Sequence, residues 1–279
     1  MMKKYIYFKL IGLALLIVSM AACDTADQEV SPVVSPDGYP VATYTLSSPS
    51  TSIVEGDTLI YIITTDKPID RSITFSAEAL SGTAGAEDYI IIPTVLEPYT
   101  TEVKLYVVTV RDNMPEVTET LQLKIGGSFS IADRYLLNSL TVPVTVDMNI
   151  VNYNDPDVLT IAFGWPNPDD DIDCYALLGT TQWGSAATSA NPEILTAIWP
   201  TDPNGTYYFG IDPYLVNEPI LDYTISIGYP DQTVQFITGA FDTANLGSYT
   251  LDHYGTAPIY RLLTIVNLDG VFTITNLNK

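Results

Sequence analysis

Basic residues are scarce in this chain of 279 residues, which has 11 Lys and Arg against 33 Asp and Glu. Three of the basic residues (Lys3, Lys4 and Lys9) precede Cys23, whereas no acidic residue does, so 8 basic residues remain against 33 acidic ones and the formal charge is −25. A surface of this sign repels phosphate backbones, and we therefore exclude nucleic acid as a partner. Cations, neutral glycans and other proteins remain as binding partners.

Cysteine and histidine are also nearly absent, with two Cys and one His. If Cys23 is modified, Cys174 has no partner for a disulfide, and the single His253 cannot build a histidine-rich zinc site. The sequence contains no Gly-x-Ser-x-Gly and no His-Glu-x-x-His motif. A Cys174–His253 dyad and a glycosidase-type carboxylate pair are the remaining catalytic alternatives. We expect no enzyme, and a hydrolase is a distant alternative.

Only one long hydrophobic run is present, and it lies at the N-terminus. Residues 10–20 are apolar, follow three lysines and end in Ala21-Ala22-Cys23, which predicts a signal peptide over residues 1–22. The run is shorter than the about 20 residues of a membrane span. Its end resembles the lipobox of bacterial lipoproteins, which implies acylation of Cys23 and a lipid anchor at the bacterial outer membrane or cell surface. An ordinary secretory signal is the alternative.

Helical spacing is hard to find beyond the signal peptide. Residues 23–40 are rich in Pro, Ser and acidic residues and predict a flexible tether. Short β-branched and aromatic segments between turn residues then predict an immunoglobulin-like β-sandwich over residues 41–148, a linker over 149–156 and a second, jelly-roll-like sandwich over 157–279. The predicted fold class is therefore all-β with two β-sandwich domains. Asn204-Gly205 and Asp269-Gly270 each predict a tight hairpin turn.

Three blocks of the first predicted domain resemble the Calx-beta family: 54–57 (VEGD), 82–89 (GTAGAEDY) and 112–119 (DNMPEVTE). The resemblance implies an immunoglobulin-like sandwich whose loops at one end bind Ca²⁺. Calcium takes six to eight oxygen ligands, chiefly from carboxylates and carbonyls in loops. The candidate ligands are Glu55, Asp88, Asp112, Glu116 and Asp147.

Arg111 argues against that site, because calcium-binding members of the family carry a further acidic residue beside the position of Asp112. A cation among the ligands would oppose Ca²⁺ binding directly. The alternative is a degenerate site, with Glu116 and Glu119 on a solvated strand edge. Calcium is thus the one cofactor that the sequence predicts, and the choice between a working and a degenerate site stays open.

The second predicted domain carries the densest acidic cluster, which supplies Asp169, Asp171 and Asp173 as candidate cation ligands. Their spacing matches the opening of an EF-hand loop, but Cys174 and Thr180 replace the Gly and Glu that the loop needs, so we reject an EF-hand. Residues 157–228 resemble bacterial pre-peptidase C-terminal domains at 171–175 (DIDCY) and 204–209 (NGTYYF). This resemblance implies a non-catalytic accessory domain.

Tryptophan offers a second kind of candidate site. Trp165 and Trp183 lie among Pro, Gly and Gln, so we expect them to be exposed and able to stack on sugar rings. Trp199 follows an alternating apolar strand and is expected in the core, as are Ile172, Cys174 and Ala176. The sequence as a whole predicts a lipid-anchored, non-catalytic binding or adhesion protein whose partner is a surface protein or a neutral glycan. A glycan-binding accessory lipoprotein is the alternative.

Overall fold

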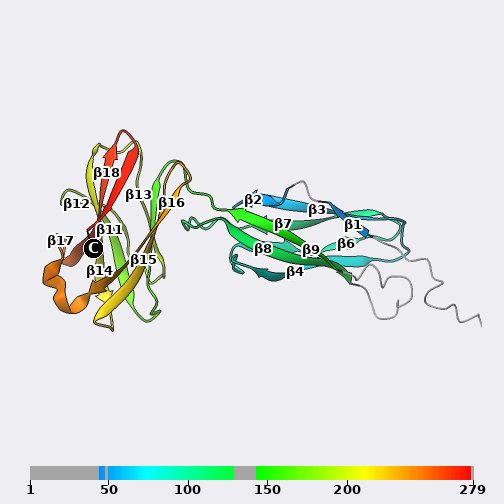
Figure 1. The fold of residues 1–279 in the computed structure, drawn as a ribbon, viewed down its shortest axis with the longest axis horizontal. Helices are drawn as coiled ribbons and strands as arrows, with labels where there is room; N and C mark the ends of the chain where they lie inside the picture. Colours follow the sequence, from blue (N-terminus) through cyan, green and yellow to red (C-terminus); the bar gives the residue numbers. More distant parts are fainter. Residues whose placement is uncertain (1–43, 48–49, 129–142, 278–279) are drawn as a thin grey trace, which may run out of the picture.

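The chain folds into two β-sandwiches, each around its own hydrophobic core (Figure 1). The computed structural model describes residues 44–47, 50–128 and 143–277. Within these ranges the elements are strands apart from one 3₁₀ segment, η3 (Thr243–Ser248). The predicted all-β fold class is confirmed. None of the helical residues in these ranges forms a helix long and apolar enough to cross a membrane.

The first sandwich packs a four-stranded sheet on a five-stranded sheet. The four-stranded sheet has the order β1 (Tyr44–Ser47), β3 (Thr58–Thr65), β7 (Glu102–Thr109), β5 (Tyr89–Ile92). The five-stranded sheet has the order β2 (Ser52–Val54), β9 (Val144–Val151), β8 (Glu119–Ser128), β4 (Ile73–Gly82), β6 (Thr94–Leu96). Alternate residues point inward, as in Leu121, Leu123 and Ile125 of β8, and each such buried side chain contributes roughly 1.5–3 kcal/mol to the free energy of unfolding.

The second sandwich packs a four-stranded sheet on a six-stranded sheet. The smaller sheet has the order β13 (Glu193–Ile198), β10 (Leu159–Gly164), β15 (Ile220–Gly228), β16 (Val234–Asp242). The larger sheet has the order β12 (Thr181–Ala186), β11 (Asp171–Leu178), β14 (Gly205–Leu215), β18 (Ala257–Leu268), β17 (Leu251–Tyr254), and β19 (Val271–Asn276) also pairs with β18. Ile172, Cys174 and Ala176 of β11 are fully buried between the sheets, which confirms the predicted alternation.

The two predicted hairpin turns have different outcomes. Asp269 and Gly270 both have positive φ and join β18 to β19, as a two-residue turn of this kind requires. The prediction for Asn204-Gly205 is wrong, because β13 and β14 belong to different sheets and a longer connection joins them. The side chain of Asn204 instead donates a hydrogen bond to Asp269 (2.8 Å).

Two predictions about tryptophan exposure are also wrong. The side chain of Trp165 is only 7% exposed, because it packs in the core against Phe163 and donates its indole N–H to the carbonyl of Asp170 (3.2 Å). Trp199 is 43% exposed, because β13 ends at Ile198 and the inward alternation ends with it. The apolar alternation therefore predicted β13 correctly, but it did not extend to Trp199, the first residue after the strand.

A short, hydrogen-bonded connection joins the sandwiches. β9 continues to Val151, so the connection begins later than the predicted linker. Asn154 is buried, and its side chain donates to the carbonyl of Thr233 (3.0 Å) in the β15–β16 turn. The backbone of Asn154 exchanges two hydrogen bonds with the side-chain amide of Gln232 (3.1 and 2.7 Å). These contacts attach the connection to the second sandwich.

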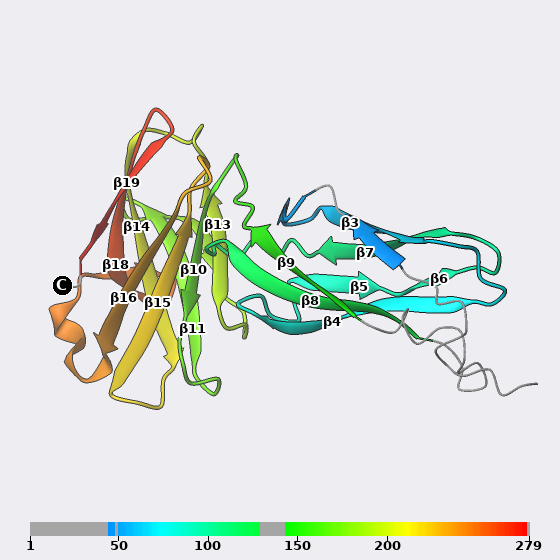
Figure 2. The same ribbon diagram turned by 45° about the vertical axis from the view of Figure 1, so that its right-hand side comes forward.

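A loop of the first sandwich also touches the second. The β7–β8 connection (110–118) carries Met114 and Pro115, and Pro115 is buried. A Cβ added to Gly228 at the end of β15 would lie 3.2 Å from the Cβ of Pro115 and 2.4 Å from Oδ1 of Asn154. The absence of a side chain at Gly228 thus lets the loop and the connection approach the sheet of β15 (Figures 1 and 2).

Replacing Asn154 tests this junction. Asn154→Ala removes the bond to Thr233 and the bond that Asn154 Oδ1 accepts from buried Asn152 (2.8 Å), so we expect the free energy of unfolding to fall by about 1–3 kcal/mol. We also expect a broader distribution of distances in small-angle X-ray scattering. Asn245→Ala, at an exposed position in η3, is the matched control. Equal effects of the two substitutions on both measurements would contradict a specific role of Asn154.

Candidate metal centre

The loop between β4 and β5 is fastened to the beginning of β8. The amides of Thr83 and Ala84 both donate to the carbonyl of Thr120 (2.9 and 3.1 Å), and the amide of Thr120 donates to the hydroxyl of Thr83 (2.9 Å). Gly82 has φ +142°, and a Cβ there would lie 2.1 Å from the Thr120 carbonyl oxygen. Only glycine allows this approach. The loop that carries Asp88 is thereby held beside Glu119.

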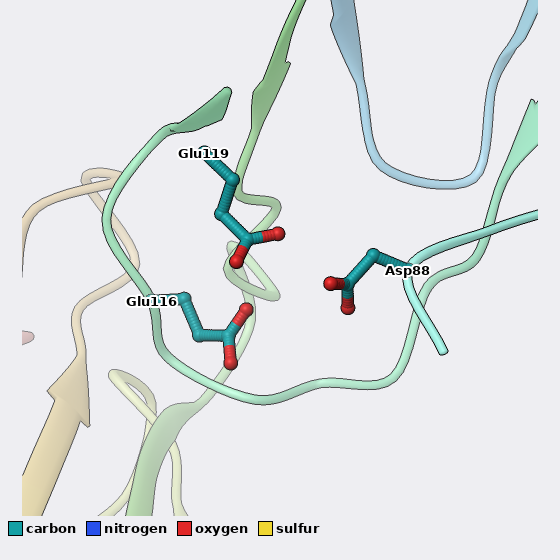
Figure 3. Close-up of side chains that lie close together, drawn as sticks. All are labelled: Asp88, Glu116 and Glu119. Carbon is teal, nitrogen blue, oxygen red and sulfur yellow. The ribbon is translucent and has the colours of Figure 1, made fainter. Parts of the chain in front are cut away.

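Asp88 is buried at the end of this loop. Its Oδ2 accepts a hydrogen bond from the amide of Gly85 (2.5 Å), which closes a tight turn, and its carbonyl accepts one from the amide of Val110 (2.8 Å). The second bond connects the loop to the beginning of the 110–118 connection. Asp88 is thereby held beside the stretch that carries Glu116 and Glu119, and its carboxylate faces theirs (Figure 3).

Three carboxylates converge at this end of the first sandwich (Figure 3). Asp88, Glu116 and Glu119 each place one carboxylate oxygen so that all three atoms lie within 4.8 Å of one another. No donor reaches the buried Oε2 of Glu119 within the described part of the chain. We call these three residues the junction carboxylates, because Glu116 directly follows Pro115 at the contact with the second sandwich.

Burial and mutual repulsion perturb this cluster. Burial, followed by repulsion from Asp112 and Asp88, raises the pKa of Glu116 to about 7. Burial, followed by repulsion from Asp88 and Glu116, raises the pKa of Glu119 to about 7 as well. The pKa of Glu55 also rises to about 7, mainly through burial, although the amide of Tyr153 donates to its Oε2 (3.1 Å). Without a cation, the cluster therefore resists full ionisation at neutral pH.

The structure brings together most of the predicted calcium ligands. Asp88 and Glu116 belong to the junction carboxylates, and Glu55 and Asp112 lie near enough to affect their titration. Asp147 does not join them, because it faces Gln122 across β8 and β9 and accepts a hydrogen bond from its amide (2.8 Å). Glu119, which the sequence placed among alternatives as a solvated strand-edge residue, contributes instead. Its position at the first residue of β8, directly after an acidic loop, was the available signal.

Arg111 does not enter the cluster. Its guanidinium carbon lies 3.6 Å from the centroid of the Tyr153 ring, in the connection between the sandwiches. A cation over an aromatic face is stabilised there by about 0.5–1 kcal/mol at exposed sites. The basic residue that opposed Ca²⁺ binding in the sequence is thus engaged with Tyr153.

The donor set fits a hard divalent cation. All three junction carboxylates offer oxygen, and Ca²⁺ prefers carboxylate and carbonyl oxygens, whereas zinc sites use Cys and His. Two further carboxylates, Glu55 and Asp112, add negative charge nearby. The buried, unpartnered oxygen of Glu119 is the kind of atom that a bound cation satisfies. The residues present therefore suit Ca²⁺.

The acidic cluster of the second sandwich is divided by its strand. Asp169 is exposed in the turn before β11, whereas Asp171 and Asp173 lie on β11 itself, on the face opposite the core. Asp170 is buried, and its Oδ1 accepts hydrogen bonds from the backbone amide (3.0 Å) and side-chain amide (2.8 Å) of Asn217. Asp170 therefore has a structural role, and the other three do not form one loop site.

The two tryptophans predicted to stack on sugars differ in exposure, because Trp165 is buried whereas Trp183 is partly exposed. Trp165 is buried, and Trp183 packs edge-on against Tyr207 and donates its indole N–H to Oδ2 of Asp202 (2.9 Å). Stacking on a sugar needs an exposed ring face, which Trp165 does not offer.

Cys174 and His253 do not form a catalytic dyad in this structure. Cys174 is fully buried between the sheets, and burial raises the pKa of its thiol well above the usual value. His253 is exposed on β17. An inert thiol and a surface imidazole cannot form a nucleophile–base pair. Cys23, the predicted lipidation site, lies outside the described residues, as do residues 1–43 that were predicted as signal peptide and tether.

Comparisons with known proteins give only distant similarities. No family model and no curated protein matches the sequence. Among solved structures, the apo-form Calx CBD1 domain is 14% identical and covers 41% of this chain and 100% of its own, with a TM-score of 0.30. A two-domain protein of unknown function from Bacteroides fragilis is 10% identical and covers 79% of this chain and 84% of its own, with a TM-score of 0.34. Similarities at these scores do not identify a function for this chain.

Proposed function

We propose that this protein is a non-catalytic binding protein of the bacterial cell envelope that holds a divalent cation, Ca²⁺, at the junction carboxylates. The observation that supports the proposal most is the convergence of Asp88, Glu116 and Glu119 within 4.8 Å. The sequence supports the location, since a signal peptide ending in Ala21-Ala22-Cys23 would give a lipid anchor. The acidic composition, with only two Cys and one His to serve as catalytic groups, supports binding or adhesion as the role.

A bound cation would connect three segments of the chain that differ in their contacts. Asp88 belongs to the β4–β5 loop, Glu119 begins β8, and Glu116 belongs to the connection that touches the second sandwich through Pro115. The amide of Tyr153, in the connection between the sandwiches, donates to nearby Glu55. Neutralising the cluster would therefore stiffen the first sandwich at the end that meets the second.

Glycan binding is a second candidate function, favoured by an open cleft on the second sandwich that Met114 of the first sandwich borders. The cleft has a volume of about 830 Å³, within the usual range for ligand sites. Met114 lines it from the first sandwich, and Asp222, Thr224 and Thr238 line it from the second. Hydroxyl and carboxylate groups suit a neutral sugar, whereas the acidic surface disfavours an anionic one.

The pH dependence of stability tests the cation site. Since the pKa of Glu116 and Glu119 rises from 4.5 to about 7 on folding, the folded state binds more protons in that window. In chelator, we expect the melting temperature to fall as pH rises from about 5 to 7.5. Calcium must displace these protons, so it should raise the melting temperature at pH 7.5 by several degrees at 100 times its Kd and far less at pH 5. Equal shifts at both pH values would contradict the site.

A substitution at Glu119 should have opposite effects on stability in chelator and in Ca²⁺. Glu119→Gln removes repulsion, so in chelator we expect a melting temperature above that of the unmodified protein. In Ca²⁺ the stabilising shift should be reduced or lost, because one ligand charge is gone. Asp147→Asn, whose partner is Gln122, is the matched control and should keep the full Ca²⁺ shift. Loss of the shift in the control alone would place the cation elsewhere.

The lipid anchor has a separate test in cells. We expect the protein to partition with the membrane fraction and to incorporate a labelled fatty acid. Cys23→Ser should abolish the label and release the protein, because no other acylation site is predicted at the signal peptide end. Labelling that survives Cys23→Ser would contradict anchoring through this residue.

A further inference from the structure

The outer face of the four-stranded sheet in the first sandwich is apolar. In β3, β7 and β5 alternate residues point into the core, so the residues between them point outward. Apolar side chains dominate this outward set, which includes Ile60, Ile62, Tyr106, Val108, Ile90 and Ile92. The register places Ile60, Tyr106 and Ile92 in one row across three strands, where opposite side chains contact one another. We call this surface the apolar face.

The other outer face of the same sandwich has the polar composition that is typical of a solvated sheet. An antiparallel sheet with one side in water alternates apolar and polar residues. The outward residues of β8 and β9 in the five-stranded sheet follow this pattern: Thr120, Gln122, Lys124, Thr145, Asp147 and Asn149. In contrast, residues 59–63 of β3 read Leu-Ile-Tyr-Ile-Ile and are apolar on both sides. The comparison indicates that the apolar face is adapted to a partner and not to water.

Within the described part of the chain, the apolar face is uncovered. Ile90 is 56% exposed and Ile92 is 46% exposed, which are high values for isoleucine in a strand. The second sandwich lies beyond one end of these strands and not over the face (Figures 1 and 2). Apolar residues that gather in one exposed patch, unlike single exposed ones, mark an interaction site.

The charge of the apolar face favours a second copy of this chain as the partner. Among the described residues, Glu102 and Lys104 of β7 are the charged members of the face, so it is formally neutral. The chain as a whole carries 33 acidic and 11 basic residues. A neutral face gives no attraction to a charged partner, whereas two copies of an acidic chain repel each other least where they are neutral.

Two-fold symmetry makes the face complementary to itself. A two-fold axis along the row of Ile60, Tyr106 and Ile92, perpendicular to the strands, lays each of these residues on its counterpart in the second copy. The same axis reverses the strand direction, so Lys104 lies opposite Val108 of the second copy and not opposite another lysine. Apolar groups thus meet apolar groups, and no like charges meet.

The size of the face predicts a weak dimer. The eight residues of β3 and of β7 span about 26 Å, and four strands side by side span about 19 Å. Each copy therefore offers on the order of 500 Å², and two copies bury about 1,000 Å², which is near the lower limit for a specific interface. We expect a dissociation constant on the order of 10 μM or weaker.

We infer that the apolar face is the interface of a homodimer, in which two copies pack the four-stranded sheets of their first sandwiches face to face. Sheets that pack in this way bury their facing side chains as the two sheets of one sandwich do. The interface uses none of the junction carboxylates, so the dimer and the cation site do not require each other.

Analytical ultracentrifugation tests the dimer in the full chain with Cys23→Ser, measured in chelator so that neither a lipid nor a cation contributes. We expect reversible self-association. Ile92→Glu and Ile92→Lys should each weaken it roughly tenfold or more, because each substitution places like charges opposite each other. An equimolar mixture of the two variants should associate again, because opposite charges then meet. Thr74→Glu, at an exposed outward position of β4 on the polar outer face, is the matched control and should leave association unchanged.

Several results would overturn the inference. A chain that stays monomeric at about 1 mM, where even a weak dimer is populated, has no self-interface on this face. Association that both Ile92 variants leave unchanged, or that Thr74→Glu weakens equally, has the same meaning. If each Ile92 variant associates less and the mixture does not recover, the two-fold arrangement is wrong. The melting temperature of the Ile92 variants should stay near that of the unmodified protein, because this side chain points outward, and it identifies any loss that comes from unfolding.

Discussion

Repulsion among partly buried carboxylates is the constraint on which the end of the first sandwich depends. Asp88 and Glu119 are held together by backbone bonds between the β4–β5 loop and Thr120, and Glu116 is held near them by the connection that Pro115 anchors. The fold therefore holds together carboxylates that repel one another when they are ionised, and this raises the pKa of Glu116 and Glu119. Either protons or a cation would neutralise the cluster, and at pH 7 a divalent cation would do so more completely.

The position of this cluster gives it influence beyond the first sandwich. The 110–118 connection contributes Glu116 to the cluster and Pro115 to the contact with Gly228, while Tyr153 bonds to Glu55 and Asn154 to the β15–β16 turn. Fixing the carboxylates in place would thus also restrict the junction, because the 110–118 connection and residues 153–154 take part in both. A long-range pathway is unnecessary, because the two features are adjacent.

The sequence could predict what depends on local pattern. The all-β class, the inward alternation of Cys174 and its neighbours and the Asp269-Gly270 turn all follow from period-two patterns and turn chemistry, and the structure confirms them. The expectation that Asp88 and Glu116 lie together came instead from the resemblance of their loops to the Calx-beta family.

What depends on strand register or on the end of an element could not be predicted. Glu119 joins the cluster because Thr120 bonds to Thr83, and Ile92 meets Tyr106 only through the pairing of β5 with β7. Asp147 was placed with the calcium ligands from its position after a strand, but the register pairs it with Gln122. Trp165 was predicted to be exposed and Trp199 to be buried, and both predictions were wrong because neighbours in space, not in sequence, determine burial.

Amide hydrogen exchange in Ca²⁺ and in chelator tests the central claim most directly, since it reads the cluster and the junction in one experiment. If a cation is held at the junction carboxylates, Ca²⁺ will slow exchange in residues 83–88 and 112–120 and, more weakly, in residues 152–154 and 229–233. Unchanged exchange in residues 83–88 and 112–120 at saturating Ca²⁺ would contradict the account, whatever happens elsewhere in the chain.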